Sequence, residues 1–234
     1  MIAIFIVLIG MTLNVAAWAA PEGIGTLADV QGTIEINGTV ARVGAELRLG
    51  MRVVTQPDSR AVLKFADGQT VTLDPSSVFW IKDYRYARNQ PTANRSSTEL
   101  LKGGMRFISG AMAKETPETV KIETPVATIG IRGTDFTVVL GSLCLLVREG
   151  AVIVSTAGKS TIGQAGQIVF VQDANTPPRF LPASELPLRC APLLETTTPG
   201  IGMSPATASA VAAATAALIG ATLMITDDDP NASP

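Results

Sequence analysis

Residues 122–136 read IETPVATIGIRGTDF, a run in which strand-forming residues are interrupted by one proline and two glycines. Its apolar side chains occupy even positions in residues 120–122, odd positions in residues 127–131 and even positions again in residues 136–140. Because successive strand residues point to opposite faces of a sheet, each change of parity requires a bulge or a bend. The inward face therefore changes twice within this stretch.

The two changes of parity coincide with Thr124-Pro125 and with Arg132-Gly133. The residue before a proline is held extended and proline donates no ladder hydrogen bond, while glycine can adopt a positive φ. Both pairs therefore suit a change of direction. We predict three short strand segments joined by two tight corners.

Arg132 and Asp135 flank the second predicted corner. A corner leaves backbone polar groups unpaired, so we expect Asp135 to accept hydrogen bonds from N–H groups of the turn. We expect Arg132 to pair with Asp135 or with backbone carbonyls. The alternative is that Arg132 reaches outward to a partner.

This stretch resembles the signature of the periplasmic domain of the ferric-citrate regulator family, FecR, whose pattern is TPxATxGxRGTxF. The resemblance continues upstream in residues 50–55 and 59–68 and covers roughly residues 25–171. It implies an exported β-rich interaction domain, placed here at residues 24–172, and no particular substrate. The pattern is carried by Thr124, Pro125, Ala127, Thr128, Gly130, Arg132, Gly133, Thr134 and Phe136, with Asp135 in the variable slot.

Two hairpins are expected before the central stretch. Asn37-Gly38 lies between residues 33–36 and 39–41, and Asp67-Gly68 lies between residues 60–65 and 69–73. Asn-Gly and Asp-Gly favour the positive φ angles of tight hairpin turns. Both therefore predict antiparallel strand pairs.

A polar excursion follows the short strand predicted at residues 78–81. Residues 83–97 carry arginines without apolar periodicity, so we expect an exposed loop. Exposed aromatic and arginine side chains are enriched at interfaces. The candidate interaction loop residues are Tyr84, Arg85, Tyr86 and Arg88, and the alternative is a solvated surface excursion.

Further strands are predicted at residues 100–109, 143–147, 151–155 and 167–171. Glycine-containing turns separate most of them, and helical periodicity is almost absent, which indicates an all-β domain. A sandwich, a roll or a solenoid would satisfy this pattern. The two parity changes and the FecR resemblance favour short antiparallel strands in a twisted roll or solenoid-like stack.

The N-terminal end is predicted to direct export. Residues 2–15 are apolar, and Ala17-Trp18-Ala19 provides the small residues that a signal peptidase accepts, so we expect a signal peptide at residues 1–19. No Lys or Arg precedes the apolar run, and the alternative is an uncleaved anchor. Both place the domain in the periplasm.

The C-terminal end changes composition after residue 172. Residues 173–205 are rich in proline and are expected to form a linker without regular ladders. Residues 206–226 form an uncharged run long enough to cross a membrane as a helix, and residues 227–234 form an acidic tail. This apolar C-terminal helix outside the domain would anchor the chain in the inner membrane. The alternative is an alanine-rich surface helix or a disordered tail.

Composition restricts the chemistry that this chain can perform. The 234 residues include no histidine, which excludes Ser-His-Asp and Cys-His catalysis and removes the commonest ligand of transition metals. A formal net charge of −2 and scattered Lys and Arg do not provide a basic footprint for nucleic acid. We therefore expect no enzyme activity, no cofactor, no metal and no nucleic-acid partner.

The two cysteines, Cys144 and Cys190, form an even pair that is allowed to bridge in an oxidising compartment. A disulfide would tie the proline-rich segment back onto a strand. Two unpaired buried thiols are the alternative.

Three functions are consistent with the sequence. The first, which the FecR resemblance implies, is a non-enzymatic envelope module that binds another protein and takes part in signal transduction. No stretch resembles the anti-sigma segment of the regulators, so the resemblance is to a stand-alone exported FecR domain protein. The second is a small-ligand or glycan-binding domain that uses Tyr84, Tyr86 and Trp80. The third is a structural or adhesive component of the envelope.

Overall fold

The computed structural model describes residues 23–190 and 193, all of which belong to one compact unit, Met1–Leu194. This part of the chain is built almost entirely of strands, and α1 (Met112–Glu115) is a single helical turn. The strands are β1 (Gly25–Gln31), β2 (Ile34–Ile36), β3 (Thr39–Ala41), β4 (Glu46–Leu47), β5 (Arg52–Thr55), β6 (Arg60–Phe65), β7 (Thr70–Leu73), β8 (Val78–Arg85), β9 (Arg95–Lys102), β10 (Gly104–Ile108), β11 (Val120–Glu123), β12 (Thr128–Val139), β13 (Leu143–Thr156), β14 (Lys159–Gln164), β15 (Ile168–Val171) and β16 (Arg179–Leu181). The short 3₁₀ turns are η1 (Pro91–Ala93), η2 (Pro117–Thr119), η3 (Ala183–Glu185) and η4 (Leu188–Cys190).

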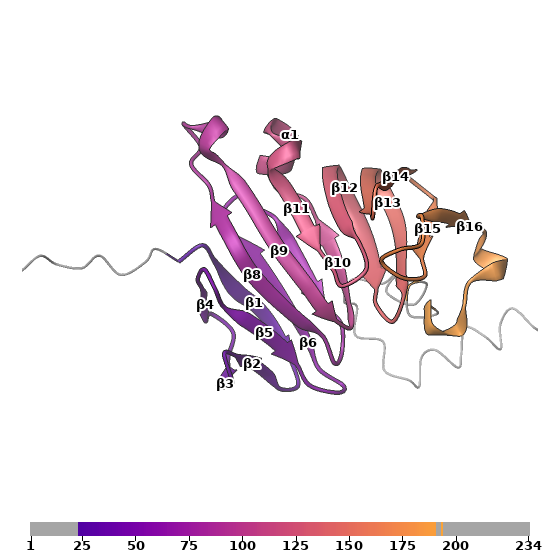
Figure 1. Cartoon of the computed structure of the whole chain (residues 1–234). Helices are drawn as coiled ribbons and strands as arrows, with labels where there is room; N and C mark the ends of the chain where they lie inside the picture. Colours follow the sequence, from indigo (N-terminus) through magenta and orange to yellow (C-terminus); the bar gives the residue numbers. More distant parts are fainter. Residues whose placement is uncertain (1–22, 191–192, 194–234) are drawn as a thin grey trace, which may run out of the picture. The chain divides into compact units, whose positions relative to one another are not determined.

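All sixteen strands belong to one sheet that curls on itself into a half-barrel (Figure 1). Its main path runs β3-β2-β5-β8-β9-β11-β12-β10-β7-β6-β1-β4, and β13 to β16 continue from β12. The pairing of β9 with β11 is parallel, and the other pairings are antiparallel. The predicted all-β class of short, mainly antiparallel strands is confirmed.

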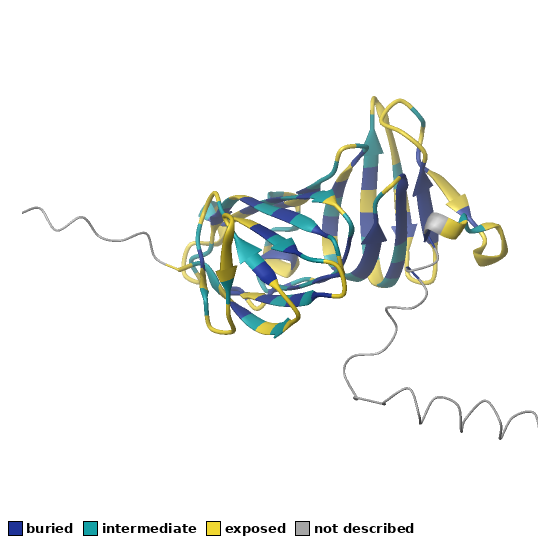
Figure 2. Ribbon diagram, turned by 90° about the horizontal axis from the view of Figure 1, so that it is seen from below, coloured by how far each residue is buried: buried dark blue, intermediate teal, exposed yellow. Residues whose placement is uncertain are grey.

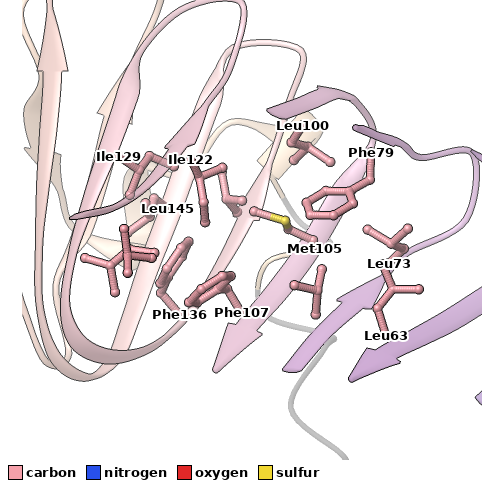
Figure 3. Close-up of a cluster of buried hydrophobic side chains, with 14 of the residues drawn as sticks. Leu63, Leu73, Phe79, Leu100, Met105, Phe107, Ile122, Ile129, Phe136 and Leu145 are labelled. Atoms are coloured by element: carbon pink, nitrogen blue, oxygen red, sulfur yellow. The ribbon is translucent and has the colours of Figure 1, made fainter. Parts of the chain in front are cut away.

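The hydrophobic core fills the inside of the curled sheet. Buried and less buried residues alternate along most strands, as expected when one face of a sheet packs on the core (Figure 2). Phe79 of β8, Phe107 of β10 and Phe136 of β12 are fully buried side chains of this cluster (Figure 3). The rings of Phe107 and Phe136 stack with centroids 5.4 Å apart. The centre of the core thus includes a residue from the decisive stretch.

Both predicted hairpins are confirmed. In the β2–β3 turn, Asn37 and Gly38 have φ angles of 51° and 78°, the left-handed pair that such a tight turn requires. β6 pairs with β7 across the second turn, where Gly68 has a φ of 86°.

The first parity change is a hairpin turn between β11 and β12. The Thr124 hydroxyl oxygen accepts a hydrogen bond from the N–H of Ala127 at 2.9 Å and donates to its carbonyl oxygen at 2.7 Å. These bonds fix the tip that carries Pro125. The predicted direction change at this point is confirmed.

The second parity change is a β-bulge inside one strand, not a corner between two. The pairing of β12 with β13 changes register between Arg132 and Asp135, and Gly133 has a φ of 60°. Gly150 of β13, with a φ of 72°, lies against this bulge. The predicted change of the inward face at Gly133 is therefore correct. The stretch forms two strands, β11 and β12, instead of the three predicted segments.

The bulge allows one long hairpin to serve two parts of the sheet. Residues 128–130 of β12 pair with β11, and residues 135–139 pair with β10. β13 is divided in the same way, because residues 143–146 pair with β15 and residues 151–156 pair with β14. The strands predicted at residues 143–147 and 151–155 are therefore parts of one strand, β13. This division of partners lets the sheet turn from one wall of the half-barrel to the other.

Two strand boundaries differ from the sequence prediction. Residues 83–97 are not one exposed loop, because β8 continues to Arg85 and pairs with β9 from Arg95 onward. The loop is limited to residues 86–94. Residues 100–109 form two strands because the chain turns at Gly103, whose φ is 84°.

The chain after β15 packs on the sheet instead of leaving it. β16 pairs with β15, so the expectation that residues 173–205 contain no ladder does not hold for Arg179–Leu181. A second apolar cluster includes Val139, Phe170, Leu181 and Leu193. Cys144 and Cys190 are joined by a disulfide, with Cα atoms 5.8 Å apart. This bond fastens the returning segment to β13.

The predicted signal peptide at residues 1–19, linker residues 191–192 and 194–205, the apolar run at 206–226 and the acidic tail lie outside the described residues. Within residues 23–190 and 193, no helix is long and apolar enough to cross a membrane.

The bulge provides the first prediction. A Cβ atom at Gly150 would overlap the carbonyl oxygen of Gly133, whereas a Cβ at Gly158, with a similar φ of 79°, would meet no atom within 4 Å. Gly158→Ala should cost about 1 kcal/mol of unfolding free energy through its backbone conformation alone. Gly150→Ala should cost about 3 kcal/mol or more, because the clash adds to that strain. Urea unfolding followed by tryptophan fluorescence measures both, and equal losses would contradict this account of the bulge.

The disulfide provides the second prediction. It links residues 46 positions apart, and loop closure of this size contributes about 3 kcal/mol or more. Cys190→Ser should lower the unfolding free energy by about this amount. The unfolding free energy of the wild-type protein, measured with a thiol reductant present, should equal that of the variant. The reductant should not change the unfolding free energy of the variant.

Candidate functional site

The residues of the central motif divide into two groups, and the first group builds the fold. The side chains of Ala127, Thr134 and Phe136 are buried. Thr124 closes the hairpin turn and Gly133 forms the bulge. The sequence around these five positions is therefore explained by packing and backbone geometry.

Asp135 also belongs to the structural group, but with a partner that the sequence did not reveal. Arg106 of β10 donates two hydrogen bonds to its carboxylate, from Nε at 2.9 Å and from Nη2 at 2.5 Å. These bonds raise the pKa of the Arg106 guanidinium above its ordinary value. The predicted pairing of Asp135 with Arg132 is wrong, because the bulge directs the carboxylate toward the neighbouring strand. The N–H of Thr134 is bound by Ser109 Oγ at 2.9 Å.

The second group consists of Thr128, Gly130 and Arg132, which alternate along β12 and face away from the core. Among the described residues, Arg132 makes no ion pair and no side-chain hydrogen bond. Gly130 has no positive φ, and a Cβ there would lie at an ordinary 3.6 Å from Ile153. Neither folding geometry nor packing requires glycine at this position.

The strand register places Gly130 in an outward-facing row. Lys121 of β11 lies opposite Gly130, Gly130 lies opposite Ile153 of β13, and Ile153 lies opposite Ile162 of β14. Both isoleucines are exposed, at 40% and 59%. We name this surface the Gly130 face, and it consists of Lys121, Thr128, Gly130, Arg132, Ile153 and Ile162.

The missing side chain of Gly130 leaves a hollow of about 230 Å³ on this face. Its lining residues are Pro117, Glu118, Val120, Lys121, Gly130, Ile131, Arg132 and Ile153. Exposed apolar side chains beside charged ones are the composition of an interaction site with an apolar centre and a polar rim. The hollow is suited to receive one apolar side chain from outside.

The charges around the hollow are unequally compensated. Lys121 Nζ lies 3.0 Å from Oε1 of Glu123, which also pairs with Lys82 of β8. The hydrogen bond with Lys82, and then that with Lys121, lowers the pKa of Glu123. Arg132 has no such carboxylate partner in the part of the chain that the structure describes. The guanidinium is therefore the group on this face that is best placed to bind an external anion.

The candidate interaction loop does not present its first aromatic side chain. Tyr84 is 4% exposed, its ring packs 5.3 Å from that of Phe65, and its hydroxyl donates to Asp67 Oδ1 at 3.0 Å. Burial raises the pKa of Tyr84 strongly, which keeps the phenol protonated. Arg85 and Arg88 are exposed, and Tyr86 packs partly against the core. Tyr84 is buried because the β8–β9 pairing shifts register between Ile81 and Asp83, which moves the buried positions of β8 from odd to even residues.

Trp80 lies on the outer face of the sheet under two cations. Arg52 and Lys82 approach its ring, at 5.0 and 5.2 Å from the centroid. Its aromatic surface is thus already in cation–π contact. With Tyr84 buried, one of the three aromatic side chains on which the predicted glycan site depended is withdrawn from the surface.

The buried carboxylates have structural environments. Asp67 accepts the Tyr84 hydroxyl and the backbone N–H of Gln69, at 3.0 Å each. Burial raises the pKa of Asp74, and Arg60 at 3.5 Å lowers it in part. Within the described residues, no three side chains of His, Cys, Asp or Glu come together as a metal site.

The family model described as FecR protein matches residues 51–153. The predicted FecR-like domain is thus shown for this segment, which contains the whole central motif and most of the Gly130 face. No match was found among curated proteins.

Two of the solved structures that resemble this chain have the same description. Both are crystal structures described as "a putative anti-sigma factor" from Parabacteroides distasonis. Each is 16% identical and covers 56% of this chain and 58% of the solved chain, with TM-scores of 0.46 and 0.45. The chain therefore matches less than two thirds of the length of these proteins.

The two groups of motif residues should respond differently to substitution. Arg132→Glu should change the unfolding free energy by less than about 0.5 kcal/mol, because the Arg132 side chain does not pack in the core. Gly130→Ala should not lower the unfolding free energy, because the φ of Gly130 is not positive and a Cβ there has room. Arg106→Ala should cost about 1–3 kcal/mol, because it leaves the carboxylate of Asp135 without its partner in a partly buried site. Urea unfolding distinguishes them. A loss for Arg132→Glu as large as that for Arg106→Ala would assign Arg132 a structural role.

Proposed function

We propose that this chain is a non-enzymatic FecR-like domain that binds another protein of the bacterial cell envelope and thereby takes part in signal sensing. The match of residues 51–153 to the FecR family supports the regulatory part of this proposal. The observation that carries the binding part is the outward group of motif residues, Thr128, Gly130 and Arg132, which the fold itself does not need.

The Gly130 face is the proposed contact surface. Its hollow accepts an apolar side chain, and Arg132 beside it offers a guanidinium that makes no ion pair with a described residue. Arginine binds carboxylates through two parallel hydrogen bonds, which adds directional specificity to the contact. The partner is therefore a protein segment that presents an aliphatic side chain next to an aspartate or glutamate.

We place the partner on the face of the sheet instead of on its edge. Among the described strands, β14 pairs with β13 alone, which leaves its other side as an edge. The returning segment already touches that side, because the hydroxyl of Thr161 donates to the Pro178 carbonyl at 3.2 Å. A strand added there would have to displace it. The exposed side chains of Ile153 and Ile162 have no such cover in the described residues.

The proposed location is the periplasm, with export by residues 1–19 and inner-membrane anchoring by residues 206–226. The composition of these two ends supports this part of the proposal. The disulfide between Cys144 and Cys190 is consistent with an oxidising compartment.

Site-specific photocrosslinking in the native host tests the proposal. A photoreactive residue at Ile153 should yield a crosslink to one defined envelope protein, whereas one at Val40, exposed on β3 outside the Gly130 face, should not. Arg132→Glu should reduce the Ile153 crosslink at least fivefold, because it replaces the attracting charge by a repelling one. Lys114→Glu on α1 is the matched control and should leave the crosslink unchanged. Equal crosslinking at both positions, or no effect of Arg132→Glu, would reject the Gly130 face as the binding surface.

A further inference from the structure

A second hollow lies where four chain connections meet, and it shares no residue with the Gly130 face. It is contributed by the turn before β8, the β9–β10 connection, the β11–β12 turn and the β12–β13 turn. Its volume is about 480 Å³, within the range of pockets that hold small ligands. We call it the four-turn groove, and its lining residues are Ser76, Leu101, Lys102, Gly103, Pro125, Val126, Leu140 and Gly141.

Hydrogen bonds between these connections hold the groove in shape before any ligand binds. The N–H of Leu140 donates to the carbonyl of Gly103 at 2.8 Å, which joins two of them. Ser77 Oγ donates to the carbonyl of Gly104 at 2.9 Å and accepts its N–H at 3.0 Å. Because the turns are tied to one another, a ligand would not have to order them on binding.

Backbone conformation adds to this rigidity. Gly103 has a φ of 84°, and a Cβ there would clash with Ser77. Ser76, which is not a glycine, has a φ of 56°. Strained backbone of this kind persists only where the surrounding structure holds it in place.

The lining chemistry is aliphatic with one charge. Leu101, Pro125, Val126 and Leu140 provide apolar side chains, and Val126 and Leu140 rest on the hydrophobic core. The Thr124 hydroxyl bonds with the N–H and the carbonyl of Ala127, which closes the tip that carries Pro125. Lys102 is the charged residue of the lining and makes no ion pair with a described residue.

We propose that the four-turn groove binds a small amphiphile that consists of an aliphatic chain ending in a single carboxylate. The chain lies on the four apolar side chains, and the carboxylate is bound by the ammonium group of Lys102. Ligand sites of this type are mainly apolar and use a few polar groups to fix the orientation of the ligand. This site is independent of the protein contact proposed for the Gly130 face.

Decanoate is the probe, added to the full chain below its micelle concentration. Isothermal titration calorimetry should show saturable binding. Butyrate, with the same head group and a short chain, and decyltrimethylammonium, with the same chain and the opposite charge, should each bind at least fivefold more weakly. Amide NMR shifts should move at Gly103, Val126 and Gly141, which assigns the binding to the groove.

Variants test the role of the charge. Lys102→Glu should weaken decanoate binding about fivefold or more, since it replaces attraction by repulsion. Lys102→Arg should retain binding. Lys159→Glu, a matched change of an exposed lysine on β14 that makes no ion pair with a described residue, should leave binding unchanged.

Three results would overturn the proposal. They are the absence of saturable binding of decanoate, shift changes that avoid the four turns, and equal binding of the anionic and cationic probes. Failure of the Ile153 crosslink would contradict the proposal for the Gly130 face and not the proposal for the four-turn groove. Failure of decanoate binding would contradict the proposal for the groove and not that for the Gly130 face.

Discussion

The close approach of two glycines on neighbouring strands is the constraint on which the rest of the structure depends. Gly150 of β13 lies so near the Gly133 carbonyl of β12 that no side chain fits between them. This contact allows the long hairpin to bend, and the bend divides its pairing between two parts of the sheet. Without it, β12 could not join β11 and β10 in turn. The half-barrel and its enclosed core follow from that connection.

The sequence predicted those features that follow from local geometry. Parity gave the inward faces of β11 and β12 correctly, and Asn37-Gly38 and Asp67-Gly68 gave two hairpins. Such signals need only neighbouring residues. The parity change at Gly133 did not distinguish a bulge from a corner, because both shift the inward face by one residue.

Features that depend on distant parts of the chain were not predicted. The partner of Asp135 is Arg106, 29 positions away, and nothing in the sequence between them indicates that β10 lies beside β12. Tyr84 was placed in a loop because its polar neighbours resembled one, and its burial depends on Phe65 and Asp67 of another hairpin. The Gly130 row likewise needs the register of four strands. The only local indication of this row was Gly130, a glycine inside a predicted strand. A glycine at such a position is compatible with a hollow on the surface as well as with a bend of the strand.

The disulfide has a mechanical consequence for the chain that follows it. A pulling force applied beyond Cys190 would pass through the covalent bond to Cys144, at the start of β13, and not through the three residues of β16. The segment between the two cysteines would carry no tension, so β16 would not peel away first. The load would instead enter the sheet at Cys144, which lies between Val139 of β12 and Phe170 of β15. Oxidation thus turns a weakly attached edge into a point of high tensile strength.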